Sequence, residues 1–244
     1  MQWSEEGLII GVRRHGETSV ILEIMTSIRG RHLGLVRGGR SSKQRATLQA
    51  GNSVQITWRA RLEDHLGQFS AELVKSRAAA IIGERNKLNV AQLVFSHLRL
   101  LAERDPHPRL LKFVLEILDD GGDIFHQSQM LALLELALLE ELGFGLDLNS
   151  CAISGKTSGL THVSPKTGRA VTKEAAGNYV DRLFKLPLFF QRDQSASSAQ
   201  VLEALQLTGH FLHRHIWGVR EISPPMQREQ IIAQLEGNLG QEQL

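Results

Sequence analysis

The residues with the clearest chemical potential are basic side chains gathered near the start of the chain. Between Glu23 and Glu63 the sequence has no acidic residue. Over the same stretch it carries eight cationic side chains, namely Arg29, Arg31, Arg37, Arg40, Lys43, Arg45, Arg59 and Arg61. Such a segment is suited to contact phosphates along a polyanion, and the commonest polyanion in a cell is nucleic acid.

The positive charge is confined to the first third of the chain. The 244 residues carry a net charge of only +2. Residues 1–80 hold a charge of +5 and residues 81–244 a charge of −3. With 42% hydrophobic residues, the chain is long enough for two domains. We therefore expect a nucleic-acid-binding domain over residues 1–80 and a second domain over residues 81–244.

The basic segment lies in a region whose residues alternate as they do in β-strands. The clearest strand is 54–62, where polar residues alternate with apolar ones so that Arg59 and Arg61 share an open face. Its apolar face comprises Val54, Ile56, Trp58, Ala60 and Leu62. Further strands are predicted over 8–14, 19–25, 31–37 and 69–75, and 38–45 is a glycine-containing basic loop. Five short strands in about 75 residues suggest a small barrel such as the OB-fold.

Beyond residue 80 the hydrophobic periodicity becomes helical. The predicted helices cover 88–104, 109–118, 128–142, 198–217 and 226–236. Ser128 is the expected N-cap of the third helix, and Gly143 follows its end. That helix is apolar nearly all round, which is typical of the middle of a bundle. Residues 145–180 are rich in Gly, Ser, Thr and Lys with little periodicity, which predicts an inserted loop or small ribbon. The fold class is therefore α+β, a small β-barrel (OB-fold) followed by an α-helical bundle domain.

Three other groups of residues could do chemistry, but each has a plainer explanation. The segment 154–157 ends like a P-loop, yet Ser150 stands where that motif requires glycine. The histidines His210, His213 and His215 do not share one helical face, which favours a polar helix end over a metal site. Two glycines lie among Asp119, Asp120 and Asp123, a pattern that predicts a turn at the end of a helix. Because no nucleophile–base arrangement is identifiable, we expect no enzyme activity, no metal and no cofactor.

The cellular location is predicted from what the sequence lacks. Cys151 is the only cysteine, so no intramolecular disulfide can form. The first residues lack the basic start and apolar run of a signal peptide. The longest apolar stretch, 130–142, contains three glutamates and is too short to span a bilayer. These features predict a cytoplasmic protein.

Charge and barrel topology alone leave other functions open. The barrel could be an RNA-binding module, and competition between RNA and single-stranded DNA would distinguish the two. The chain could be a scaffold whose basic domain binds an acidic protein, in which case DNA would not be retained at moderate salt. A metal-dependent nuclease would degrade labelled DNA in the presence of magnesium.

Several short segments follow one another in a distinctive order. They are 8–12 leading to Gly16-Glu17-Thr18, then Leu22, Thr26 and Gly30, then 36–40, then Leu48-Gln49 before Gly51, then 142–148 followed by Cys151, and then 164–171. In order and spacing, these segments resemble the RecO recombination-mediator family of bacterial DNA repair. The resemblance covers most of residues 5–220.

The resemblance implies an OB barrel followed by an α-helical domain. Proteins of this kind bind single- and double-stranded DNA and anneal complementary strands. They work with RecR and contact the acidic C-terminal tail of single-strand-binding protein, and they help to load RecA onto coated single strands. They do so without covalent chemistry, in association with the nucleoid.

Some relatives hold zinc through two Cys-x-x-Cys pairs in the inserted segment. At the matching positions this sequence has Cys151 with Ser154, and then Thr172 with Ala175. A lone thiolate cannot build a tetrahedral structural site, so we expect no zinc.

The residues expected to contact DNA are basic and lie in the first 61 positions. They are Arg13, Arg14, Arg29, Arg31, Arg37, Arg40, Lys43, Arg45, Arg59 and Arg61. Because this domain has few aromatic residues, we expect electrostatics to dominate over base stacking. In the helical domain, Arg109 and Lys112 beside Leu111 and Phe113 are candidates for a pocket that binds a partner's acidic tail.

Overall fold

A computed structural model describes residues 1–191 and 196–242 and divides the chain into two compact units, Met1–Asp120 and Gly121–Leu244. The five strands of the first unit end at Lys75, close to the domain boundary predicted at residue 80. The helices that follow, up to Asp120, also belong to the first unit. The boundary at residue 80 stays a prediction.

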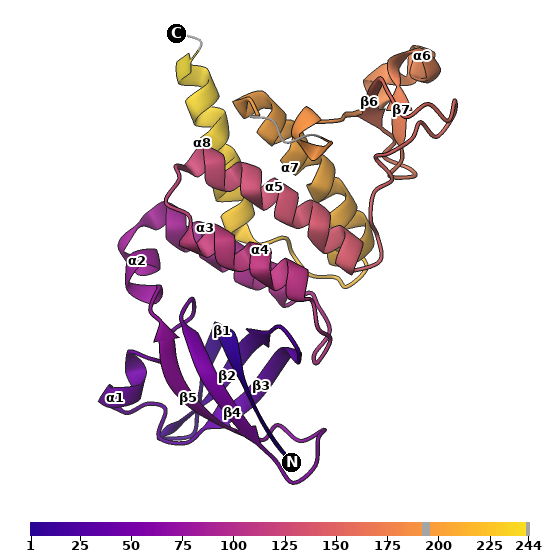
Figure 1. Cartoon of the computed structure of the whole chain (residues 1–244). Coiled ribbons are helices and arrows are strands. Elements are labelled where there is room, and N and C mark those ends of the chain that lie inside the picture. The colour runs from indigo at the N-terminus through magenta and orange to yellow at the C-terminus, as the bar shows by residue number, and fades with distance from the viewer. Residues whose placement is uncertain (192–195, 243–244) are drawn as a thin grey trace. The chain divides into compact units, whose positions relative to one another are not determined.

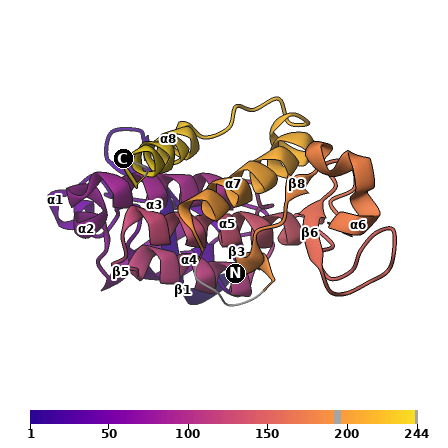
Figure 2. The same ribbon diagram turned by 90° about the horizontal axis from the view of Figure 1, so that it is seen from above.

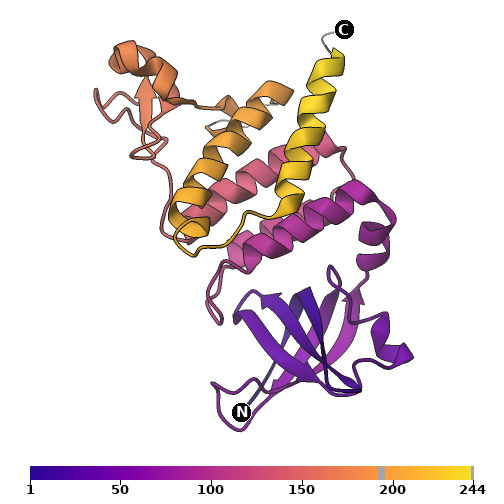
Figure 3. The same ribbon diagram turned by 180° about the vertical axis from the view of Figure 1, so that it is seen from behind.

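The first unit contains a closed barrel of five strands (Figures 1 and 3). The strands are β1 (Gln2–His15), β2 (Ser19–Thr26), β3 (Gly30–Val36), β4 (Ser53–Arg59) and β5 (Gln68–Lys75). Their order around the barrel is β1-β2-β3-β5-β4, and the long β1 pairs with β2 and with β4. This arrangement confirms the predicted α+β fold with an OB-type barrel.

Alternating side chains explain why these segments pair as strands. Val54, Ile56 and Trp58 of β4 are buried in the barrel core together with apolar residues of β2 and β5. The predicted continuation of this strand to residue 62 is wrong. β4 ends at Arg59, and Leu62, which the alternation assigned to the core, is 52% exposed in the loop that follows.

The other regular elements of the first unit are helices. They are the short α1 (Ser42–Arg45), α2 (Ala78–Gly83), α3 (Arg85–Leu98) and α4 (Pro108–Asp119). The helix predicted over 88–104 stops at Leu98 because the following segment turns back onto the barrel. There Arg99 donates from Nε to Glu23 (2.8 Å), and Arg104 adopts a left-handed backbone with φ of 63°.

An ion-pair cluster joins β5 and the start of α2 to the end of α4. Asp119 accepts hydrogen bonds from Arg77 (2.6 and 2.9 Å) and lies 2.8 Å from the ammonium group of Lys75. Arg77 also donates to Ser53, and its side chain is 7% exposed. The hydrogen bond from Arg77 lowers the pKa of Asp119 from 3.8 to about 2. Asp119 therefore does not belong to a cation site.

This cluster predicts a pH dependence of stability. A carboxylate whose pKa is lower in the folded chain stabilises the fold above its unfolded pKa and loses that contribution as the pH falls through the folded value. Asp119→Asn should therefore lower the melting temperature at neutral pH, and the difference from wild type should shrink between pH 4 and about 2. Thermal unfolding across this range measures the difference. A constant gap would contradict the assignment, and Asp181→Asn, an exposed aspartate in the second unit, is the control.

The second unit consists of a helical bundle and a small sheet. Its long helices are α5 (Ile124–Glu141), α7 (Ser198–Leu212), which continues into the π-helical turn η3 (His213–Trp217), and α8 (Met226–Glu242). α7 lies along α5 (Figure 2). Three strands, β6 (Leu160–Val163), β7 (Ala170–Thr172) and β8 (Phe184–Lys185), form a sheet in the order β7-β6-β8. The short helical elements α6 (Lys173–Ala176), η1 (Gly177–Arg182) and η2 (Leu188–Phe190) lie between β7 and α7 in the sequence. The predicted insertion over 145–180 thus holds part of a ribbon.

The beginning of α5 differs from the prediction. Its N-cap is Asp123, whose carboxylate accepts a hydrogen bond from the amide of His126 (2.9 Å). Ser128, the predicted cap, is buried inside the helix and donates to the carbonyl of Ile124. The first turn of α5 contains the polar residues His126 and Gln127. The apolar pattern that predicted the helix begins only after this turn. The predicted end is correct, since Gly143 follows α5 with φ of 83°.

α8 continues to Glu242, beyond the residue 236 predicted from periodicity, and residues 243–244 of the predicted frayed tail lie outside the described residues. No helix in the part of the chain that the structure describes is both long and apolar enough to cross a membrane.

Candidate nucleic-acid interface

One row of neighbouring residues crosses all five strands on the outer surface of the barrel. Arg13 pairs with Ile21, Ile21 with Leu35, Leu35 with Gln68, and Gln68 with Arg59. Residues directly opposite each other in paired strands point to the same face. At strand spacings of 4.7–4.9 Å, this cross-strand row follows the surface for about 19 Å.

The cross-strand row has cationic ends and an apolar middle. Arg13 and Arg59 are exposed, whereas Ile21 and Leu35 are partly exposed. Next to Ile21 and Arg59 in the sequence, Val20 and Trp58 point into the core and are buried. Because β1 also pairs with β4 and closes the barrel, the row runs around the barrel, and a single strand that followed it would have to wrap the barrel to reach both arginines.

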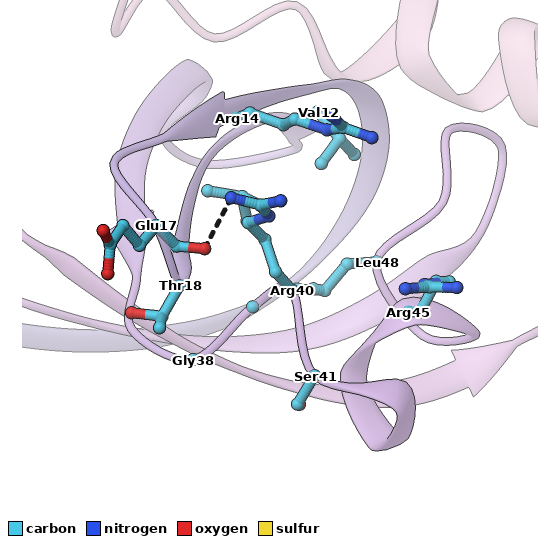
Figure 4. Close-up of a pocket in the computed structure, with 11 residues that line it drawn as sticks. Val12, Arg14, Glu17, Thr18, Gly38, Arg40, Ser41, Arg45 and Leu48 are labelled. Carbon is cyan, nitrogen blue, oxygen red and sulfur yellow. Dashed lines mark hydrogen bonds between the residues drawn. The ribbon is translucent and has the colours of Figure 1, made fainter.

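A pocket of about 770 Å³ lies beside the Arg13 end of the row (Figure 4). Val12 and Arg14 alternate with Arg13 on β1, so they face the barrel mouth instead of the outer surface. Arg40 and Arg45 come from the loop and short helix that follow β3. The three arginines Arg14, Arg40 and Arg45 therefore line one opening, together with Val12, Glu17, Thr18, Val20, Gly38, Gly39, Ser41 and Leu48.

The basic loop 38–45 forms one wall of this pocket and is held against the barrel by hydrogen bonds and close packing. The amide of Arg40 donates to Thr18 (3.0 Å), and its guanidinium donates to the carbonyls of Gly16 and Glu17. In Figure 4 the carboxylate of Glu17 points away from Arg40. A Cβ at Gly39 would lie 2.6 Å from Val20, so only glycine lets this loop pack so closely. The loop therefore presents Arg40 in a fixed direction.

Six of the ten predicted DNA contacts are exposed side chains with no hydrogen bond or ion pair within the described residues. They are Arg13, Arg14, Arg37, Lys43, Arg45 and Arg61. Their charge is not neutralised by the protein and is open to a phosphate. Arg13, Arg14 and Arg45 belong to the cross-strand row or the pocket, whereas Arg61 follows the row's other end in the sequence.

Arg31 does not belong with these free cations. Its guanidinium lies 2.8 Å from Glu23 and 3.7 Å from Glu103, and it donates to the carbonyl of Leu101. Its side chain is only 15% exposed. Because two carboxylates share its charge, Arg31 has less free positive charge to offer a phosphate than Arg13 or Arg14. Glu103 is too distant in the sequence for a local charge count to have found this pairing.

Two further predicted contacts, Arg29 and Arg59, are exposed but have protein partners. Arg29 lies 3.9 Å from Glu63 and 5.9 Å from the centre of the Trp3 ring. Arg59 donates from Nε to the side chain of Gln2 (3.0 Å). Arg29 has one long, exposed ion pair and Arg59 a neutral partner, so both remain available to a phosphate with less freedom than Arg13 or Arg14.

The aromatic side chains of the barrel pack mainly against one another. Trp3, His32, Trp58 and Phe69 form a cluster with ring centroids 5.3–6.1 Å apart. Trp58 and Phe69 are buried, and burial lowers the pKa of His32. Only Trp3 is partly exposed. This packing is consistent with binding that depends on charge more than on stacking.

The partner pocket around Arg109 and Lys112 stays a prediction. Both charged side chains are exposed on α4, and Lys112 lies 4.0 Å from Glu116. Leu111, however, is only 5% exposed and belongs to the core of the unit. Leu111 therefore faces the interior of the unit, away from solvent, although it stands between the two charged residues in the sequence.

The structure brings Cys151 close to Ser154 and Thr172, two of the other positions at which the resemblance would place zinc ligands. The sulfur of Cys151 accepts hydrogen bonds from the amides of Ser154 (3.4 Å) and Thr172 (3.5 Å), and Thr172 in turn accepts one from the amide of Ala175. The bonds from Ser154 lower the pKa of the Cys151 thiol to about 6. Ser, Thr and Ala cannot supply the missing thiolates, so the donor set does not fit structural zinc.

Two of the three histidines considered as ligands have other contacts. His210 lies within hydrogen-bond distance of the Pro165 carbonyl (3.1 Å), and His215 stacks on Phe144 with ring centroids 4.5 Å apart. No group of three potential metal-ligating His, Cys, Asp or Glu side chains is found in residues 1–191 and 196–242.

Comparisons with known proteins agree with this architecture. The family profile described as recombination protein O N terminal matches residues 1–77, and that described as recombination protein O C terminal matches residues 97–220. The chain is 46% identical over 237 residues to a DNA repair protein RecO of Mesorhizobium japonicum, covering 96% of this chain and 94% of the relative. It is 47% identical over 231 residues to one of Agrobacterium fabrum, covering 94% and 91%. The chain therefore belongs to the RecO family.

Proposed function

We propose that this protein acts in DNA repair as a recombination mediator that binds single- and double-stranded DNA through its barrel. The observation that carries the proposal is the cross-strand row beside the arginine-lined pocket, in a chain that belongs to the RecO family. Exposed arginines without carboxylate partners bind the sugar–phosphate backbone without reading sequence. Binding would be driven by counterion release and would weaken as salt increases.

The proposed activity on DNA is the annealing of complementary strands. Two strands repel each other, and a protein that neutralises the phosphates of one strand reduces that repulsion. If a strand wraps the barrel so that phosphates contact Arg13 and Arg59 at the ends of the row, the bases between them lie over Ile21 and Leu35. These side chains offer no hydrogen bonds to hold the bases, which therefore stay available for pairing. No covalent bond is made or broken in this mechanism.

The partners proposed for this role are RecR, the acidic tail of single-strand-binding protein and, indirectly, RecA. Arg109 and Lys112 can supply positive charge to an acidic tail, but an apolar pocket for it must come from residues other than Leu111. A protein engaged in this work would associate with the nucleoid.

Annealing of complementary oligonucleotides tests the proposal. With one strand carrying a fluorophore and the other a quencher, wild-type protein should increase the annealing rate by at least about tenfold, since charge neutralisation acts on every encounter. The increase should survive when one strand is coated with single-strand-binding protein. A protein that binds RNA and DNA equally and accelerates no annealing would instead support a general RNA-binding module, and loss of labelled strand with magnesium would indicate a nuclease.

A further inference from the structure

The loop between β4 and β5, residues 60–67, carries Arg61 and follows the Arg59 end of the cross-strand row. Its last residues are held by the barrel itself. Trp58 donates from Nε1 to the carbonyl of Leu66 (3.1 Å), and the amide of Leu35 donates to Gly67 (3.0 Å). The middle of the loop includes Leu62, whose side chain is exposed.

The middle of this loop is held by a residue from outside the barrel. Arg104 lies in the connection between α3 and α4, and its Nη2 group donates to the carbonyls of Asp64 (3.1 Å) and His65 (3.3 Å). One guanidinium nitrogen thus bridges two successive carbonyls. Arg104 contacts none of the residues of the cross-strand row by a hydrogen bond or ion pair in the described chain.

The backbone of Arg104 is also fixed. Its amide donates to the carbonyl of Arg31 on β3 (2.8 Å), next to a parallel bridge between Arg31 and Glu103. Its φ of 63° lies in the left-handed region, which is unfavourable for arginine. Glycine would adopt this backbone conformation more easily than arginine. The hydrogen bonds that the guanidinium donates to the loop give a reason why the position holds arginine.

We propose that Arg104 is a positioning residue for DNA binding, which holds the β4–β5 loop so that Arg61 extends the row of phosphate contacts. The inference rests on the proposed DNA-binding function. It links the connection between two helices of the first unit to the DNA-binding surface of the barrel, without direct contact between Arg104 and DNA.

Arg104→Gly separates the side chain from the backbone, because glycine accepts the left-handed conformation. We expect trypsin to cleave after Arg61 about tenfold faster in this variant, since the loop would open locally more often. Affinity for a single-stranded oligonucleotide should fall roughly threefold, as expected for one misplaced phosphate contact among several. Arg85→Ala, which removes an exposed arginine at the start of α3, should change neither quantity.

Arg104→Lys provides the second variant, because it keeps the charge and loses the fork of donors that bridges two carbonyls. It should show the same faster cleavage. Unchanged cleavage in both variants would overturn the proposal, and so would faster cleavage with unchanged affinity. If wild-type protein does not bind DNA, the proposed function fails, and the cleavage data then show separately whether Arg104 holds the loop.

Discussion

Arg228→Ala should remove about 3–5 kcal/mol of stability from the second unit. Arg228 projects from α8 and is 8% exposed, and its guanidinium donates to both carboxylate oxygens of Glu135 on α5 (2.8 and 3.0 Å). Glu135 is fully buried and also accepts a hydrogen bond from Thr208 on α7. Removing the arginine would take two charge-assisted hydrogen bonds from this buried carboxylate.

The surroundings of Arg228 show that this ion pair joins three helices. The guanidinium also donates to the carbonyl of Leu205, and it lies 5.8 Å from the centre of the Trp217 ring. A Cβ at Gly209 would lie 2.7 Å from Nη2 of Arg228, so the glycine provides the space for the side chain. The buried charge pair therefore contacts all three helices, α5, α7 and α8.

Amide hydrogen exchange of α7 and α8 measures this effect within the intact chain. Glu229→Ala, at the exposed neighbouring position, should leave exchange in α7 within experimental error. The double variant Glu135→Leu with Arg228→Met should recover part of the loss, because two apolar residues replace both buried charges. A loss below about 1 kcal/mol for Arg228→Ala would show that the pair does not hold the helices together.

The local sequence pattern was sufficient to predict most of the barrel strands, but not the full length of β1. Alternation predicted a strand from residue 8, whereas β1 begins at Gln2. Its first half contains Glu5 and Glu6, which resemble a solvated terminus. These residues become a strand because they pair with β4, opposite Ile56 and Gln55. Partners that are distant in the sequence decided the structure here.

The candidate site was predictable in composition but not in arrangement. A charge count treats Arg31 and Arg37 alike, yet Arg31 is ion-paired and Arg37 is exposed without a partner in the described residues. The cross-strand row depends on the register of five strands, which no local pattern contains. Arg104 gave no signal either, because its role depends on one left-handed residue and two loop carbonyls.

Replacing Arg13, Arg14 and Arg45 together by alanine should weaken binding of single-stranded DNA by up to about a hundredfold at low salt. The estimate takes about 1 kcal/mol for each exposed phosphate contact. These three arginines have no side-chain hydrogen bond or ion pair within the described residues, so their loss should leave the barrel folded. Arg40 is kept, because it donates to the carbonyls of Gly16 and Glu17. The matched control replaces Arg85, Lys156 and Arg182, three exposed cations outside the row and the pocket, by alanine.

The salt dependence of oligonucleotide affinity tests the role of the barrel surface most directly. For a single strand, each lost phosphate contact reduces the magnitude of the slope of log K against log salt by about 0.7. We predict that the Arg13, Arg14 and Arg45 variant has a slope lower than wild type by about two, whereas the control with the same change of net charge keeps the wild-type slope. Equal slopes for wild type and both variants would contradict the assignment of DNA binding to this surface of the barrel.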